Sequence, residues 1–235
     1  MKKKIVFIMN PISGTSSKAA VPSLIDSTLD KEQFEYEIKM TERPGHASEL
    51  AAEARDNHAD IVVAVGGDGT VNEVARSLVH SDSALGILPC GSGNGLARHL
   101  LLPMNLKKSI EIINACEIHD LDYGVINEYP FFCTCGMGFD AFVSMKFAES
   151  GKRGPISYAE NILREGLKYE PETYTLEDET GTKQYKAFLI SCANASQYGN
   201  NAYIAPQASM SDGLMDVVIM EPFDVIEASQ VSFDM

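Results

Sequence analysis

The chain has 235 residues, of which 45% are hydrophobic and 22% are charged, and this composition excludes a disordered, collagen-like or coiled-coil protein. The net charge of −14 argues against a nucleic-acid partner, because a phosphate backbone attracts basic surfaces. No window approaches the roughly 18 uninterrupted apolar residues of a membrane span, and the apolar stretch after the first lysines is too short for a signal peptide. We therefore expect a cytoplasmic protein.

Predicted strands and helices alternate over the first 120 or so residues. Four apolar or alternating segments are typical of strands, at 5–9, 34–40, 61–65 and 84–89. Apolar residues at helical spacing predict four helices, at 21–29, 50–54, 71–79 and 106–115. This order predicts a doubly wound parallel sheet that binds its ligand at the carboxyl ends of the strands.

The pattern changes after about residue 120. Five segments are typical of strands, at 131–135, 173–177, 185–193, 202–205 and 214–220. A single long helical stretch, 157–168, interrupts them. Because strands and helices no longer alternate, we expect a second, mostly antiparallel β domain. The predicted domains are an α/β domain at 1–122 and a β-rich domain at 123–235.

Three glycine-containing loops each follow a predicted strand of the first domain. They are Asn10-Pro11-Ile12-Ser13-Gly14-Thr15, Gly66-Gly67-Asp68-Gly69-Thr70 and Pro89-Cys90-Gly91-Ser92-Gly93-Asn94-Gly95. Glycines let the backbone approach a ligand closely, and a helix amino terminus offers N–H groups with a partial positive charge. A tight strand-to-helix turn would explain one such loop, but three at one sheet edge predict a polyphosphate site. Neither a P-loop nor a dinucleotide-binding fingerprint is present.

Asp68 makes this prediction more specific. A carboxylate among glycines contributes little to packing, and beside a nucleotide phosphate it needs a cation between the two negative charges. The sequence therefore implies Mg²⁺ at Asp68. The alternative is that Asp68 caps the following helix, a role that Thr70 could also fill.

The motifs in these loops carry a family resemblance. They read Asn10-Pro11-x-Ser13-Gly14, then Gly66-Gly67-Asp68-Gly69-Thr70-x-Asn72-Glu73, then Gly91-Ser92-Gly93-Asn94-x-Leu96-Ala97. In this order they resemble the nucleotide-site motifs of the diacylglycerol kinase catalytic domain family, which includes bacterial lipid kinases, diacylglycerol kinases and sphingosine kinases. Asp212-Gly213-Leu214-Met215-Asp216 resembles the D-G-x-x-D motif of that family's second domain.

The resemblance implies a fold and an activity. The fold is an α/β domain like that of NAD kinases and phosphofructokinases, followed by a β-sandwich domain that we expect to be incomplete at its C-terminus. The activity is ATP- and Mg²⁺-dependent transfer of the γ-phosphoryl group to the hydroxyl of a lipid, either diacylglycerol or a sphingoid base. Such an enzyme would contact the membrane surface peripherally, and the resemblance allows a homodimer.

The resemblance also assigns residues to roles. It implies catalytic roles for Asp68 and Asp122. It implies ATP contacts at Asn10, Ser13, Thr41, Gly66, Gly67, Asp68, Gly69, Thr70, Val71, Asn72, Glu73, Ser92, Gly93 and Asn94. It implies a Mg²⁺ site in the second domain, formed by Asp212, the Leu214 carbonyl group and Asp216. A hairpin turn remains the alternative for Asp212-Gly213, and a solvated loop acid for Asp122. The lysines and arginine of 144–168 are typical of a charged face on an ordinary surface helix, and a basic membrane-facing rim is the alternative.

One departure from the family keeps other hypotheses open. Family members usually carry a further acidic motif late in the second domain, and no acid after Asp216 lies in such a setting. One alternative is a small-molecule kinase similar to NAD kinases. Another, which applies if the chain ends at Met235, is a non-catalytic protein that binds a nucleotide or a lipid.

Overall fold

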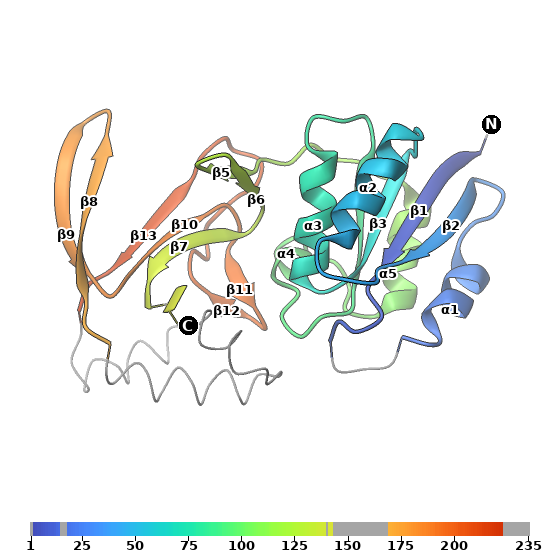
Figure 1. Ribbon diagram of the computed structural model, residues 1–235, viewed down its shortest axis with the longest axis horizontal. Helices are drawn as coiled ribbons and strands as arrows, with labels where there is room; N and C mark the ends of the chain where they lie inside the picture. The colour runs from blue at the N-terminus through green and yellow to red at the C-terminus, as the bar shows by residue number, and fades with distance from the viewer. Residues whose placement is uncertain (1, 15–17, 140, 143–168, 223–235) are drawn as a thin grey trace. The chain divides into compact units, whose positions relative to one another are not determined.

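The computed structural model describes residues 2–14, 18–139, 141–142 and 169–222 (Figure 1). The chain divides into two compact units, Met1–Phe132 and Cys133–Met235. The domain boundary that the sequence predicts, between residues 122 and 123, stays a prediction.

The first unit is built on a four-stranded parallel sheet. Its strands are β1 (Lys3–Met9), β2 (Phe34–Met40), β3 (Ile61–Gly66) and β4 (Ala84–Pro89), in the spatial order β2-β1-β3-β4. Every residue of β3 is buried, which explains its continuous apolar sequence, because both faces of a central parallel strand are covered. The strand order reverses direction between β1 and β3, and this is the switch point of the sheet.

Helices cover both faces of this sheet. They are α1 (Val21–Thr28), α2 (His46–Asp56), α3 (Asp68–Leu78), α4 (Gly95–His99) and α5 (Leu106–Ala115). Ile25 of α1 and Ile110 of α5 share a buried cluster with Phe7 and Val63, whereas α2 and α3 pack against each other and against β1 and β3. The predicted doubly wound parallel sheet is therefore confirmed.

A short hairpin follows the helices in the first unit. It consists of β5 (Gly124–Ile126) and β6 (Tyr129–Phe131). Arg76 of α3 donates from Nε to the Pro130 carbonyl group over 3.2 Å, and its guanidinium lies over the Tyr129 ring. These contacts attach the hairpin to α3.

The second unit is antiparallel in the part that the structure describes. Its strands are β7 (Thr134–Gly138), β8 (Glu172–Asp178), β9 (Gly181–Ala187), β10 (Leu189–Ala193), β11 (Gln197–Gly199), β12 (Ala202–Tyr203) and β13 (Asp216–Met220). One sheet has the order β13-β10-β7, and β8–β9 and β11–β12 form hairpins. Aromatic rings of Phe139 and Phe188 lie 4.5 Å apart in its core. The predicted helix at 157–168 and the basic rim at 144–168 lie outside the described residues.

One predicted strand of the second unit is divided in the structure. The sequence predicts a continuous strand over 185–193, but β9 ends at Ala187 and β10 begins at Leu189. Phe188 between them donates its N–H to Met220 and accepts an N–H from Phe139. Its backbone groups thus belong to neighbouring segments at the point where the chain passes from the β8–β9 hairpin into the three-stranded sheet.

Candidate functional site

The loops after β1, β3 and β4 lie together at the carboxyl edge of the parallel sheet (Figure 1). Backbone hydrogen bonds tie the first and third loops to the end of β3: Asn10 donates to Val65 over 3.1 Å, and Cys90 donates to Gly66 over 2.7 Å. Two of these loops leave the switch-point strands β1 and β3, where open α/β sheets bind their ligands. The structure thus gathers the glycine-containing loops at the edge that the sequence predicts.

The loops can touch one another because glycine, which has no side chain, occupies the points of contact. A Cβ atom added to Gly14 would collide with the carbonyl oxygen of Cys90, and one added to Gly67 would lie 3.0 Å from the Cα atom of Gly91. Gly14 also has a φ angle of 72°, in the left-handed region that favours glycine. Because the first and second loops both contact the third, their backbones form one continuous glycine-lined surface.

The side chains of the first loop are tied to the backbone and to α3. The Asn10 side chain accepts the N–H of Ile12 over 3.1 Å and donates to the Thr70 hydroxyl over 3.4 Å. The Ser13 hydroxyl donates to the Asn10 carbonyl group over 3.2 Å. Asn10 therefore both shapes its own turn and connects it to the first turn of α3.

Lys18 is a candidate that the sequence analysis did not single out. Its side chain is buried, and its ammonium group donates to the Ser13 carbonyl group. Burial raises the pKa of the Cys90 thiol, and the positive charge of Lys18 opposes that rise. A buried ammonium group thus lies beside the first and third loops. The signal in the sequence is a lysine that follows glycine, threonine and serines, shortly after a loop that the sequence predicts to bind phosphate.

Asp68 joins the second loop to the third. One of its carboxylate oxygens accepts the N–H of Asn94 over 2.8 Å, and the other accepts the N–H of Gly95 over 2.6 Å. The helix cap is Gly67, so Asp68 is the first residue of α3 and not its cap. Each oxygen keeps further acceptor capacity, since a carboxylate offers about four lone-pair sites.

The start of α3 is open to a ligand. The first backbone hydrogen bond of the helix runs from Val71 to Gly67, so the N–H groups of Asp68, Gly69 and Thr70 have no partner within the helix. Gly69 is exposed, and a Cβ atom added to it would meet nothing within 4 Å. The partial positive charge of the helix start and this open space suit an anionic phosphate.

Asn94 holds the third loop in shape. Its side-chain oxygen accepts the N–H of Gly91 over 2.8 Å, and its side-chain nitrogen donates to the Gly91 carbonyl group over 2.9 Å. Its backbone is left-handed, with φ of 54°. Since this amide is buried and bonded within its own loop, its direct effect is on loop shape, and its predicted contact with ATP stays a prediction.

Glu73 and Thr41 connect the site to α2. The Glu73 carboxylate accepts the N–H groups of Gly45 and Ala47, each over 3.1 Å, at the start of α2. Thr41 is buried and extends the pairing of β1 with β2 by donating its N–H to Met9. In the structure both residues position the segment before α2, and their predicted contacts with ATP stay predictions.

The remaining residues that the sequence predicts to contact ATP differ in solvent exposure. Gly66 and Val71 are buried, Asn72 and Gly93 are partly buried, and Ser92 is exposed on the third loop. The Gly93 carbonyl group accepts a hydrogen bond from Arg98. Asp122 is partly buried before β5, and its catalytic role stays a prediction.

The predicted metal residues of the second unit form a turn. Asp212 and Asp216 are exposed, and the Asp212 carboxylate accepts the N–H of Leu214 over 3.0 Å. Gly213 between them has a φ angle of 73°. This geometry is a turn before β13, but it is not the hairpin turn of the alternative, because β13 pairs with β10 and not with the preceding strand β12. Mg²⁺ binding there stays a prediction. Within the described part of the chain, no group of three or more His, Cys, Asp or Glu side chains could hold a metal ion.

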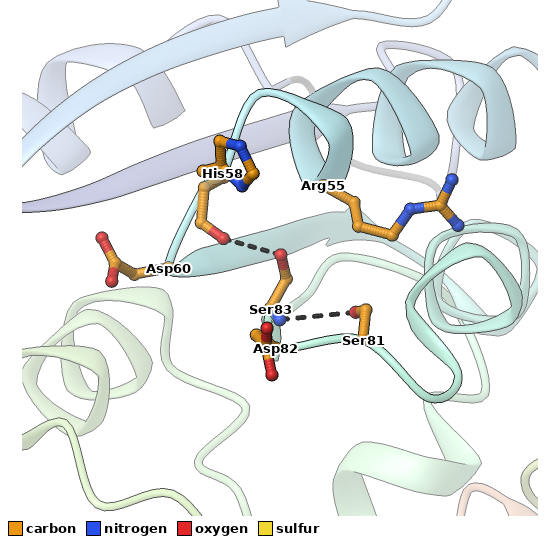
Figure 2. Close-up of a pocket in the computed structure, with 7 residues that line it drawn as sticks. Arg55, His58, Asp60, Ser81, Asp82 and Ser83 are labelled. Atoms are coloured by element: carbon orange, nitrogen blue, oxygen red, sulfur yellow. Dashed lines mark hydrogen bonds between the residues drawn. The ribbon is translucent and has the colours of Figure 1, made fainter.

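A shallow polar hollow lies at the opposite, amino edge of the sheet (Figure 2). Arg55, His58, Asp60 and Asp82 line it together with Ser81 and Ser83. The Ser83 hydroxyl donates to the Ala59 carbonyl group over 2.6 Å. Asp60 and His58 point in different directions in Figure 2, so their side chains do not converge on one point. This edge offers residues for control substitutions.

Neither unit contains a helix, among the residues that the structure describes, with the length and hydropathy needed to cross a bilayer.

Comparison with protein-family models gives a match for each unit. Residues 4–126 match the model described as the diacylglycerol kinase catalytic domain. Residues 133–231 match the model described as the YegS C-terminal NAD kinase beta sandwich-like domain.

Individual relatives agree with the family models. The lipid kinase YegS of Escherichia coli K12 is 28% identical over 207 residues, which cover 85% of this chain and 69% of the relative. The diacylglycerol kinase of Staphylococcus saprophyticus is 27% identical over 242 aligned residues, covering 98% of this chain and 77% of the relative. A crystal structure of a diacylglycerol kinase from Bacillus anthracis matches with a TM-score of 0.74 and 19% identity, over 97% of this chain and 80% of that one. This last likeness shows the fold, and with the second family model it confirms the predicted β-sandwich domain.

Proposed function

The chain belongs to the diacylglycerol kinase catalytic domain family, and we propose that it is an ATP- and Mg²⁺-dependent lipid kinase. The observation that carries the proposal is the meeting of three glycine-containing loops at the start of α3. There Gly14 and Gly67 lie against the third loop, and the Asp68 carboxylate bonds to that loop's backbone.

The residues at this edge fit a nucleotide polyphosphate. Phosphate oxygens are acceptors, and the start of α3 supplies N–H donors that have no partner within the helix. Gly69 leaves open space in front of them. Lys18 adds a positive charge beside the first and third loops. Asn10 would hold the first loop next to the start of α3 through its hydrogen bond to Thr70, so that both could contact the phosphates.

The donor set also fits a magnesium ion. Mg²⁺ prefers oxygen ligands and is usually held by one or two carboxylates together with substrate phosphates. Asp68 supplies a partly buried carboxylate beside the helix start. When bound, the ion would neutralise the charge between Asp68 and the phosphates. Asp68 itself, fixed by two backbone N–H groups, would keep its position without any change in the third loop.

Phosphoryl transfer depends mostly on positioning and charge stabilisation, so a rigid loop cluster of this kind contributes directly to the rate. Asp122 is our candidate for orienting the acceptor hydroxyl. We propose diacylglycerol as the acceptor, because one relative is named a diacylglycerol kinase, and we keep a sphingoid base as the second choice. We further propose that the protein works at the membrane surface, where such lipids are found.

The test is a kinase assay with radiolabelled ATP and Mg²⁺ on diacylglycerol, sphingosine and NAD in parallel. Label in a lipid supports the proposal, whereas label in NAD alone would replace it with a small-molecule kinase. We expect Asp68→Asn to lower kcat at least about 100-fold, the size of effect that loss of one charge-stabilising group has in other enzymes. Asp82→Asn, in the hollow at the opposite sheet edge, is the control and should keep full activity. Full activity of Asp68→Asn would remove the role assigned to this carboxylate.

A further inference from the structure

The C-terminus of α4 contains a leucine where the backbone favours glycine. Leu101 donates its N–H to Arg98 over 3.0 Å, and Leu102 donates to Ala97 over 2.8 Å. These two bonds define a Schellman motif with Leu101 at the C′ position, which is usually glycine because it is left-handed. Leu101 has a φ angle of 56°, so this bulky residue adopts a conformation that costs conformational energy.

Packing within the first unit does not account for this choice. The Leu101 side chain is 87% exposed, more than any other large hydrophobic side chain in the described parts of the chain. Met104, three residues later, is also exposed. The segment 100–104 therefore presents apolar side chains to its surroundings from a backbone that is fixed by hydrogen bonds.

This apolar segment borders the candidate nucleotide site. The Asn94 side-chain nitrogen of the third loop lies 3.9 Å from the Met104 sulfur. The Ser109 hydroxyl of α5 donates to the Pro103 carbonyl group over 2.6 Å. The C-terminal end of α5 lies at the amino edge of the sheet, since Cys116 accepts a hydrogen bond from Lys3 at the start of β1. The start of α5 and the segment before it therefore lie at the carboxyl edge, beside the glycine loops.

Two lysines beside this segment also work against the stability of the fold. Lys107 and Lys108 lie in the first turn of α5, which has no acidic residue. Positive charges there oppose the partial positive charge of the helix start. Both side chains are exposed, and neither forms an ion pair within the part of the chain that the structure describes. Lys107 and Lys108 thus place a local positive charge on a chain whose net charge is −14.

We propose that Leu101, Met104, Lys107 and Lys108 form a docking surface for an anionic lipid bilayer. The leucine and the methionine would enter the interface, and the lysines would bind acidic headgroups, in the combination that surface-bound proteins use. The inference rests on the proposed function, since it names the surface by which the nucleotide site would be brought to its lipid acceptor. The opposite charge of the headgroups favours a bilayer over a second copy of this acidic chain.

The experiment measures sedimentation of the full chain with phosphatidylcholine vesicles that contain or lack phosphatidylglycerol. We expect binding only to the anionic vesicles, weakened by salt. Leu101→Gly should weaken this binding about tenfold, the factor that corresponds to about 1.4 kcal/mol, since a leucine gives up its burial in the bilayer. Lys107→Glu with Lys108→Glu should weaken it by a similar factor or more, because each surface lysine contributes to binding of an acidic membrane.

Both variants should raise the melting temperature, which separates lost docking from misfolding. Glycine relieves the left-handed backbone at residue 101, and glutamates favour the start of α5. His58→Gly is the matched backbone control. His58 is the C′ residue of the same motif at the end of α2, with a φ angle of 55°, and lies at the opposite sheet edge. Lys2→Glu with Lys3→Glu, at that edge, is the matched charge control. Neither control should alter vesicle binding.

Wild-type binding that is absent, or that Leu101→Gly leaves unchanged, overturns the docking surface. Conversion of a dimer to a monomer by Leu101→Gly, with vesicle binding unchanged, overturns it in favour of an interface between copies. Phosphorylation of a water-soluble short-chain diacylglycerol tests the proposed function separately. Loss of vesicle binding in Leu101→Gly supports the docking surface on its own. If the wild type fails to phosphorylate the short-chain substrate, that failure counts against the proposed kinase activity and not against the docking surface.

Discussion

At the scale of single residues, the carboxylates of the first unit act as connectors between elements. Asp68 bonds to the backbone before α4, and Glu73 bonds to the backbone at the start of α2. Both lie on α3, in its first and second turns. The helix that presents its amino terminus to the candidate phosphate site thereby also fixes the two segments on either side of it.

Replacing Glu73 by alanine tests this connection. Glu73→Ala leaves the N–H groups of Gly45 and Ala47 without their acceptor and removes a negative charge from the start of α2, so we expect a loss of about 1–2 kcal/mol in the free energy of unfolding. Urea unfolding measures it. Glu49→Ala is the control, because Glu49 forms an exposed ion pair with Arg43 and its loss should lower the free energy of unfolding less than the loss of Glu73 does. Equal stability of the two variants would show that Glu73 does not hold α2 in place.

At the scale of elements, the glycine loops divide into close contacts and open space. At positions 67 and 91 a side chain would collide, because the second and third loops meet there. At Gly69 a side chain would have room, since nothing lies within 4 Å of an added Cβ atom. Packing explains the first pair, and a ligand that approaches the helix start explains Gly69. Substitutions at these positions should therefore change stability in opposite directions while both weakening nucleotide binding.

We expect Gly91→Ala to destabilise the fold by about 1–3 kcal/mol, because its Cβ atom would collide with Gly67 and lie 2.8 Å from the Asn94 side-chain oxygen. Gly69→Ala should instead stabilise α3 by about 0.5–1 kcal/mol, since alanine is the better helix former and has room. Thermal unfolding without ligand and isothermal titration with Mg²⁺ and ATP measure the two effects. If Gly69→Ala is more stable and binds ATP as the wild type does, the phosphates do not approach the start of α3.

Much of the first unit could be predicted from the sequence because its elements produce local patterns. The continuous apolar runs of β1 and β3 and the helical spacing of α3 report burial directly, and the three loops are recognised by their glycines. The contacts between these loops could not be predicted in this way. That Gly14 lies against Cys90, or that Lys18 is buried beside Ser13, depends on atoms brought together from separate segments.

The roles of individual polar residues were harder to predict for the same reason. Glu73 and Asn94 belong to motifs that the sequence associates with the nucleotide, and in the structure their side chains bond to the backbone of the first unit. A motif identifies which residues matter at a site. Whether each one contacts the ligand or shapes the loop that does so is decided by hydrogen bonds that no spacing reveals.

At the scale of the whole molecule, each of the two units has a core of its own. One cluster includes Phe7, Val63 and Ile110, and the other includes Phe139 and Phe188. All three glycine-containing loops belong to the first unit. A ligand that binds only these loops stabilises by mass action the unit that contains them.

Amide hydrogen exchange of the full chain tests where the nucleotide binds. At Mg²⁺ and ATP concentrations of about 100 times Kd, we expect the free energy of opening of the β1 and β3 amides to rise by about 2.7 kcal/mol. The β10 amides in the second unit should change by less than about 0.5 kcal/mol, because their strand pairs with β7 and β13 and not with the loops. ATP without Mg²⁺ is the comparison, and it should protect less, since the Asp68 carboxylate then faces the phosphates with no cation between them. Equal protection of β10 would mean that residues of the second unit contribute to nucleotide binding.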